Sequence, residues 1–159
     1  MWMFKLLGVA MLLGSGWMLS HVLNCRATAA LRQNEAFMAL LRRIRGQIEC
    51  FGRPIGEILG GCGAEELAAC GYTEEGAPAD LSTLLSHVTA CDTPTLETVS
   101  RFAEEFGRGY REDEVRACDY ALSLLDARRA TLADELPLKK KQNTVLCVCA
   151  ALALALVLL

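Results

Sequence analysis

The sequence REDEVRACDYALSLLDARRATLADELPLKKKQ, residues 111–142, decides the fold class. Its apolar residues recur at intervals of three and four, which places them on one stripe of a helix. A stripe of this kind packs against another helix, so the stretch predicts a helical bundle. The members of the stripe are Val115, Cys118, Leu122, Leu125, Leu132 and Leu136.

Both ends of the chain are apolar. NTVLCVCAALALALVLL, residues 143–159, carries no charge, and the first 23 residues carry only Lys5. The N-terminal run approaches the roughly 20 residues that span a bilayer, whereas about 15 apolar residues of the tail reach only about 22 Å. We therefore predict an N-terminal transmembrane helix (1–23), a helical bundle domain (24–142) and a short C-terminal transmembrane or membrane-inserted helix (143–159).

The flanking charges predict an orientation. Arg26 follows the first apolar segment, and Lys139, Lys140 and Lys141 precede the second. Because basic residues mark the cytoplasmic side of a span, the middle domain is expected in the cytoplasm. Trp2 and Lys5 flank the first segment at its N-terminal end. Lys5 favours the opposite orientation, but it is one charge against several. A cleaved signal peptide is the alternative for this segment, but no small-residue cleavage site closes the apolar run.

Between these ends, the pattern predicts helices only. The first helix continues to about Phe51, short helices follow near Pro54–Leu59, Ala64–Cys70 and Asp80–Thr89, and a further helix starts at Asp92–Thr95. The apolar stripe of this last helix runs through Tyr110. The turn at 107–109 suggests that this helix and the closing helix form an antiparallel hairpin of two long helices. The first helix's stripe is Phe37, Leu41, Ile44, Ile48 and Phe51, and the later one is Leu96, Val99, Ala103, Phe106 and Tyr110. Without sustained alternation, the expected fold is an all-α bundle of one domain.

Composition excludes several functions. The formal net charge of -3 leaves no basic footprint for nucleic acid. The paired acids lack a histidine or cysteine placed as an acid/base partner, so we expect no catalytic residues and no small-molecule substrate. A buried ion pair or the frayed end of the bundle would explain Arg129, which interrupts the closing stripe.

The eight cysteines and two histidines also have a simple interpretation. In a cytoplasmic domain the cysteines serve as small buried hydrophobes, with Cys50 and Cys118 on apolar helix faces. No C-x-x-C pair occurs, and the i, i+4 pair His87 and Cys91 has no second pair to complete a metal site. We expect neither a metal nor a cofactor.

Two segments together resemble a known family. These are IECFGRPIGEIL, residues 48–59, and FAEEFGRGYREDEVRACDYALSLLDARR, residues 102–129, which stand before a charged helix and a short hydrophobic C-terminus. This order, over essentially the full chain, resembles the stage III sporulation protein AB family. Pro54, Ile55, Glu57, Ile58 and Leu59 match a family segment after the first long helix, and Phe102, Phe106 and Gly107 match a family turn.

The resemblance implies a location and partners. Members sit in the mother-cell membrane facing the forespore, within a transenvelope channel built from stage III sporulation A proteins. Their cytoplasmic domain is similar to that of the type II secretion F protein, and the expected partner is the secretion-type ATPase, protein AA. A non-enzymatic platform subunit is therefore expected. The family-motif or candidate partner-contact residues are Pro54, Glu57, Phe102, Phe106, Gly107, Arg108 and Arg111.

Two other functional classes stay open at the level of sequence. An exported, disulfide-stapled and membrane-anchored binding module would use the same cysteines in bridges. A type II secretion or pilus-like inner-membrane platform component would share the fold, although it normally carries a duplicated domain. An enzyme is the weakest interpretation.

Overall fold

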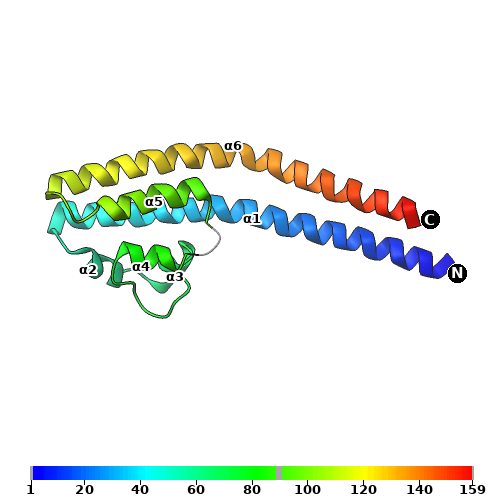
Figure 1. Ribbon diagram of the computed structural model, residues 1–159, viewed down its shortest axis with the longest axis horizontal. Coiled ribbons are helices and arrows are strands. Elements are labelled where there is room, and N and C mark those ends of the chain that lie inside the picture. Colours follow the sequence, from blue (N-terminus) through cyan, green and yellow to red (C-terminus); the bar gives the residue numbers. More distant parts are fainter. Residues whose placement is uncertain (1, 89–90, 159) are drawn as a thin grey trace. The chain divides into compact units, whose positions relative to one another are not determined.

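The computed structural model describes the backbone of residues 2–88 and 91–158, and the side chains of residues 11, 14–88 and 91–153. These residues form helices and no strand, with one isolated bridge between Tyr72 and Val88. The predicted all-α class is confirmed. The helices are α1 (Trp2–Phe51), α2 (Ile55–Gly60), α3 (Ala64–Ala69), α4 (Leu81–Ser86), α5 (Thr93–Glu105) and α6 (Arg111–Leu158) (Figure 1).

The chain divides into two compact units. The paired-helix unit comprises Met1–Ala29 and Ala133–Leu159, which are the outer parts of α1 and α6. The bundle unit comprises Ala30–Leu132, with the remainder of both long helices and all of α2 to α5.

The core of the bundle unit is built on the predicted stripe of α1. Phe37, Leu41, Ile44 and Ile48 are all buried, as the spacing predicts. Phe51 is different, because 67% of it is exposed. The helix ends at this residue, and Gly52 turns the chain away with a φ of +59°. A side chain beyond the last packed turn has no opposing helix to cover it.

The stripe of α6 covers the same core from the other side. Cys118, Leu125 and Leu132 are buried, and Val115 and Leu122 are half-buried. α5 runs beside both long helices in the bundle unit (Figure 1). The periodicity of residues 111–132 therefore identified its buried face.

α5 is shorter than its stripe predicts. The helix spans 13 residues and ends at Glu105. Phe106 has extended backbone, and Gly107 has a φ of +84°, a left-handed conformation that favours glycine. The hairpin with α6 therefore joins a short helix to a long one, and Tyr110 falls outside α5, with 86% of it exposed.

The short helices α2, α3 and α4 lie close to their predicted positions and close the core on the side away from α6 (Figure 1). Leu59 and Leu84 are fully buried. Asp80 caps the start of α4, because its carboxylate accepts a hydrogen bond from the Thr83 N–H at 2.6 Å. That backbone N–H lowers the pKa of Asp80, as expected for an N-cap carboxylate.

In the paired-helix unit, α1 and α6 run side by side in opposite directions (Figure 1). Much of the two predicted membrane segments lies outside the residues with described side chains, namely 1–10, 12–13 and 154–159. Among the residues that were described, neither long helix contains a stretch with both the length and the apolar character needed to cross a membrane.

Candidate functional site

The segment with Pro54 forms the start of α2. Pro54 has extended backbone, and its carbonyl accepts hydrogen bonds from the N–H groups of Glu57 and Ile58 at 3.1 and 3.3 Å. Ile58 and Leu59 are buried, whereas Pro54 and Glu57 are exposed. This family-like motif therefore anchors α2 through its apolar residues and leaves Pro54 and Glu57 accessible.

The turn between α5 and α6 separates core residues from accessible ones. Phe102 is only 3% exposed, and its ring centroid lies 5.2 Å from that of the half-buried Phe106. After Gly107 the chain is exposed from Arg108 to Arg111. Phe102 therefore holds the turn on the core, and Arg108 and Arg111 are the predicted contact residues that a partner can reach.

Two residues that were not predicted as contact residues lie at and just after the end of α1. Phe51 ends α1, and the guanidinium of Arg53 lies 5.4 Å from the centroid of the Phe51 ring. The end of α1 and the turn between α5 and α6 lie at the same end of the bundle unit (Figure 1). We call the exposed side chains at this end the turn surface, namely Phe51, Arg53, Arg108, Tyr110 and Arg111. Exposed aromatic and arginine side chains are the types most enriched at the centres of protein interfaces.

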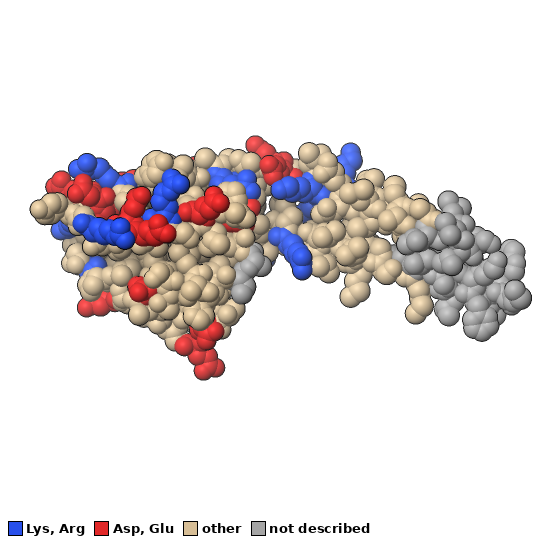
Figure 2. All heavy atoms as spheres, in the orientation of Figure 1, with Lys and Arg blue, Asp and Glu red and all other residues tan. Residues whose placement is uncertain are grey.

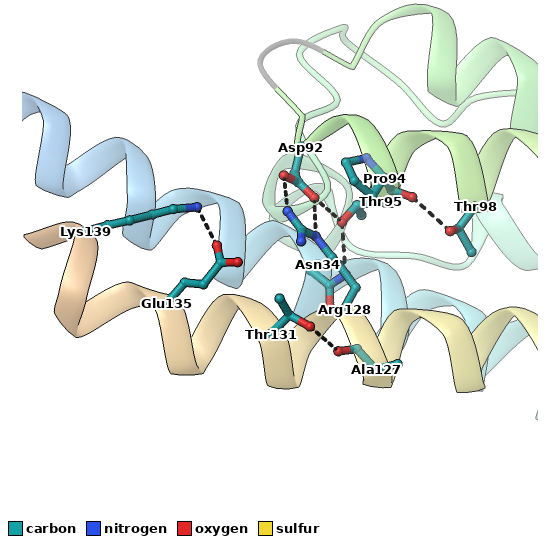
Figure 3. Close-up of polar contacts among 10 residues, drawn as sticks. All are labelled: Asn34, Asp92, Pro94, Thr95, Thr98, Ala127, Arg128, Thr131, Glu135 and Lys139. Atoms are coloured by element: carbon teal, nitrogen blue, oxygen red, sulfur yellow. Dashed lines mark hydrogen bonds and ion pairs between the residues drawn. The ribbon is translucent and has the colours of Figure 1, made fainter.

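A polar cluster joins three helices inside the bundle unit (Figure 3). Arg128 of α6 donates hydrogen bonds from Nε and Nη2 to the two carboxylate oxygens of Asp92, both at 2.8 Å. Thr95 donates to the same carboxylate at 3.2 Å and accepts from Asn34 Nδ2 at 3.0 Å. The Arg128 hydrogen bond lowers the pKa of Asp92. The cluster fixes the start of α5 against α1 and α6.

The sequence marked this cluster only indirectly. Asp92 was expected as a helix start, yet its side chain makes no cap hydrogen bond and binds Arg128 instead. Arg129, the residue that interrupts the stripe, is exposed and pairs with Asp126 at 3.2 Å. Asn34 is fully buried, and its Oδ1 has no hydrogen-bond partner among the described residues. A buried asparagine within an apolar helix face was the available signal.

The paired-helix unit has small and polar residues at its contact. Ser20, only 4% exposed, and Thr144 share a hydrogen bond of 3.1 Å between their hydroxyl oxygens. Asn143 Nδ2 donates to Asn24 Oδ1 at 3.3 Å. A Cβ added at Gly16 would lie 3.0 Å from the Cβ of Ala151, so the two helices approach closely at this glycine.

The predicted membrane-flanking residues have varied surroundings. Arg26 is exposed, and Lys139 donates to Glu135 at 2.7 Å one turn away (Figure 3). Lys140 is half-buried and Lys141 exposed. The side chains of Trp2 and Lys5 lie outside the described residues.

All eight cysteines are free thiols. Cys70 and Cys118 are buried, and desolvation raises the pKa of each thiol to about 12. Cys91, which is half-buried, has its pKa raised to about 11 for the same reason. Cys50 is exposed, so its prediction as a buried residue is wrong: it lies beside Phe51 at the end of α1, beyond the packed stripe.

In the part of the chain that the structure describes, no three His, Cys, Asp or Glu side chains are grouped to hold a metal ion. A comparison of the chain with family models, curated proteins and solved structures found no match.

Proposed function

We propose that this chain is a non-enzymatic platform subunit that holds a cytoplasmic secretion-type ATPase at a membrane. In its fullest form the proposal places it in the mother-cell membrane, within the channel of stage III sporulation A proteins, with protein AA as the ATPase. This assignment rests on the resemblance of residues 48–59 and 102–129 to the stage III sporulation protein AB family. The observation that carries the membrane part is the surface of the paired-helix unit.

That unit has its large apolar side chains on the outside. Trp17 is 73% exposed and Leu146 is 68% exposed, while the contact between the helices uses Gly16, Ser20 and Thr144. Water disfavours such a surface, whereas lipid accommodates it, and close packing of small residues with hydrogen bonds between helices is how helices associate in a bilayer. The other large apolar residues of this unit that are exposed are Met11, Met18, Leu19, Val22, Leu138, Val145, Val148 and Leu152.

Charge supports a cytoplasmic bundle unit. Arg26 and the lysines at 139–141 lie on the bundle side of the two apolar segments, which is the pattern of cytoplasmic flanks. The free state of all eight cysteines agrees with a reducing compartment.

The turn surface is the proposed contact with the ATPase. Loops at the end of a bundle are accessible, while the helix stripes are occupied by core packing. Arg108, Tyr110 and Arg111 are exposed, and within the described residues neither arginine has an ion-pair partner. Their guanidinium groups are therefore available to carboxylates of a partner.

The experiment is a pull-down of protein AA with the full chain in a non-ionic detergent. The double substitution Arg108→Glu and Arg111→Glu should reduce capture by about tenfold or more, because it reverses two charges at the contact. The matched control is Arg32→Glu with Arg42→Glu, which makes the same charge change at exposed residues of α1. Equal capture by both double variants would refute this contact. Extraction of the chain from membranes at alkaline pH, which releases peripheral proteins, would refute the membrane part.

A further inference from the structure

The basic residues of this chain are distributed very unevenly. Residues 54–91, which include α2, α3 and α4, contain no lysine or arginine, although the chain has sixteen of them. The same segment has acidic residues at Glu57, Glu65, Glu66, Glu74, Glu75 and Asp80. Acidic side chains, and no basic ones, project at the lower edge of the bundle unit in Figure 2. This part of the surface therefore repels nucleic acid and anionic lipid, and attracts cations.

Within this acidic segment lies a recess of about 490 Å³. Its lining includes the buried Leu67 and Tyr72 and the exposed Glu74 and Glu75. Its volume is within the range of pockets that hold small ligands or single side chains, roughly 300–1,000 Å³. A lining that combines apolar side chains with exposed carboxylates suits a long side chain that ends in a positive charge.

The two carboxylates at the recess have different surroundings. Glu74 Oε1 lies 3.4 Å from His87 Nδ1, and Glu75 has no ion-pair or hydrogen-bond partner among the described residues. By contrast, Glu66 is held by Arg43 at 2.7 Å, and Asp80 is engaged with the start of α4. Glu75 is therefore the unpaired carboxylate at the recess, and the exposed Glu57 and Glu65 of the same segment lie away from it.

We propose that the recess formed by Cys62, Leu67, Tyr72, Glu74, Glu75 and Ala77 binds an arginine side chain from a basic segment of a partner protein. A guanidinium fits this site better than an ammonium, because its planar group of N–H donors pairs with carboxylates in two directions. The proposal concerns a surface separate from the turn surface, so it does not depend on the ATPase contact.

The test uses the full chain in a non-ionic detergent and a fluorescein-labelled Gly-Arg-Gly-Arg-Gly peptide, with binding followed by fluorescence anisotropy. The same peptide with citrulline in place of arginine keeps the shape and removes the charge. We expect binding of the arginine peptide, weakened about tenfold by Glu74→Gln with Glu75→Gln, since each exposed charge pair contributes modestly. Citrulline should bind at least about tenfold more weakly.

Two further variants separate the recess from general charge attraction. Glu57→Gln with Glu65→Gln removes the same charge from exposed residues of the same segment that do not line the recess, and should change binding less than about twofold. Ala77→Phe fills the recess without changing charge and should weaken binding at least about tenfold. Equal losses in the two glutamate variants, unchanged binding by Ala77→Phe, or equal affinity for citrulline would each overturn the proposal. Self-association of the chain that Glu74→Gln with Glu75→Gln abolishes would assign the recess to a second copy and also overturn it.

Discussion

Arg128 donates two hydrogen bonds to the carboxylate of Asp92, one from Nε and one from Nη2, each 2.8 Å long. The two residues are 36 positions apart in the sequence. The Arg128 side chain is 23% exposed and the Asp92 side chain 18%. Among the described residues of the bundle unit, this ion pair is the least exposed to solvent. Because Thr95 links the same carboxylate to the buried Asn34, the pair stabilises the junction of α1, α5 and α6.

Asp92→Asn should lower the free energy of unfolding by roughly 1–3 kcal/mol at neutral pH, because a partly buried guanidinium loses its charged partner. Asp126→Asn, at the exposed pair with Arg129, is the control and should cost less than about 0.5 kcal/mol. Thermal unfolding followed by circular dichroism of the full chain in detergent measures both. Similar losses in the two variants would contradict a special role for Asp92.

At acidic pH the wild-type protein and Asp92→Asn should become more similar in their free energy of unfolding. The folded state has the Asp92 pKa below the ordinary 3.8, so the pair's contribution is complete above that value and is lost as the pH falls through the lower folded pKa. The same unfolding measurement, repeated from pH 7 to about pH 2, should therefore show the two melting curves converging. A difference that stays constant to the lowest pH would show that the carboxylate charge is not what Arg128 requires.

The thiols should divide into reactive and unreactive groups. Burial raises the pKa of Cys70 and Cys118 to about 12, whereas Cys50 is exposed. The thiolate is the nucleophile, so Cys50 should be alkylated by iodoacetamide at least about a hundredfold faster than the two buried thiols in the native protein. Peptide mass spectrometry over time measures the three rates. Rapid native-state alkylation of Cys70 would mean that the core opens there.

Periodicity predicted the helices and most of the core because burial of one helix face leaves a repeating signature in sequence. Leu41, Ile44 and Leu125 are buried where the spacing placed them. The spacing of apolar residues predicted burial wrongly at helix ends, because the repeat continues past the last packed turn. Phe51 and Tyr110 both continue an apolar stripe in the sequence, yet both are exposed. The chain turns at Gly52 after the first and at Gly107 before the second.

The polar cluster and the acidic recess could not be derived in this way. Successive residues on a helix point about 100° apart, so whether Arg128 or Arg129 faces the core depends on how α6 is rotated in the bundle. That rotation places Arg128 beside Asp92 and leaves Arg129 with its local partner Asp126. The recess likewise combines α3 with the loop after it, and its residues share no period.

Gly107 and Gly46 should respond to alanine in opposite directions. Gly107 has a φ of +84°, where a Cβ is strained, so Gly107→Ala should destabilise the chain by roughly 1–2 kcal/mol. Gly46 lies within α1 with nothing within 4 Å of an added Cβ, so Gly46→Ala should stabilise it by up to about 1 kcal/mol. Melting temperatures of the two variants test this. A stabilising Gly107→Ala would show that the turn does not need its left-handed residue.

α1 and α6 approach each other closely at Gly16. An added Cβ would lie 3.0 Å from the Ala151 Cβ and 3.2 Å from the Cys147 carbonyl oxygen, whereas at Gly14 it would meet nothing within 4 Å. Gly16→Val should therefore separate the two helices and weaken their pairing by roughly 1–3 kcal/mol, and Gly14→Val should not.

Hydrogen exchange of the backbone amides in residues 133–153, measured by mass spectrometry in detergent, reports the pairing directly. Faster exchange in Gly16→Val alone is the expected result, because the Ser20 to Thr144 and Asn24 to Asn143 hydrogen bonds need the same short distance between helices. If Gly14→Val accelerated exchange equally, the loss would come from valine in α1 itself, and the contact at Gly16 would not determine how the two helices pair.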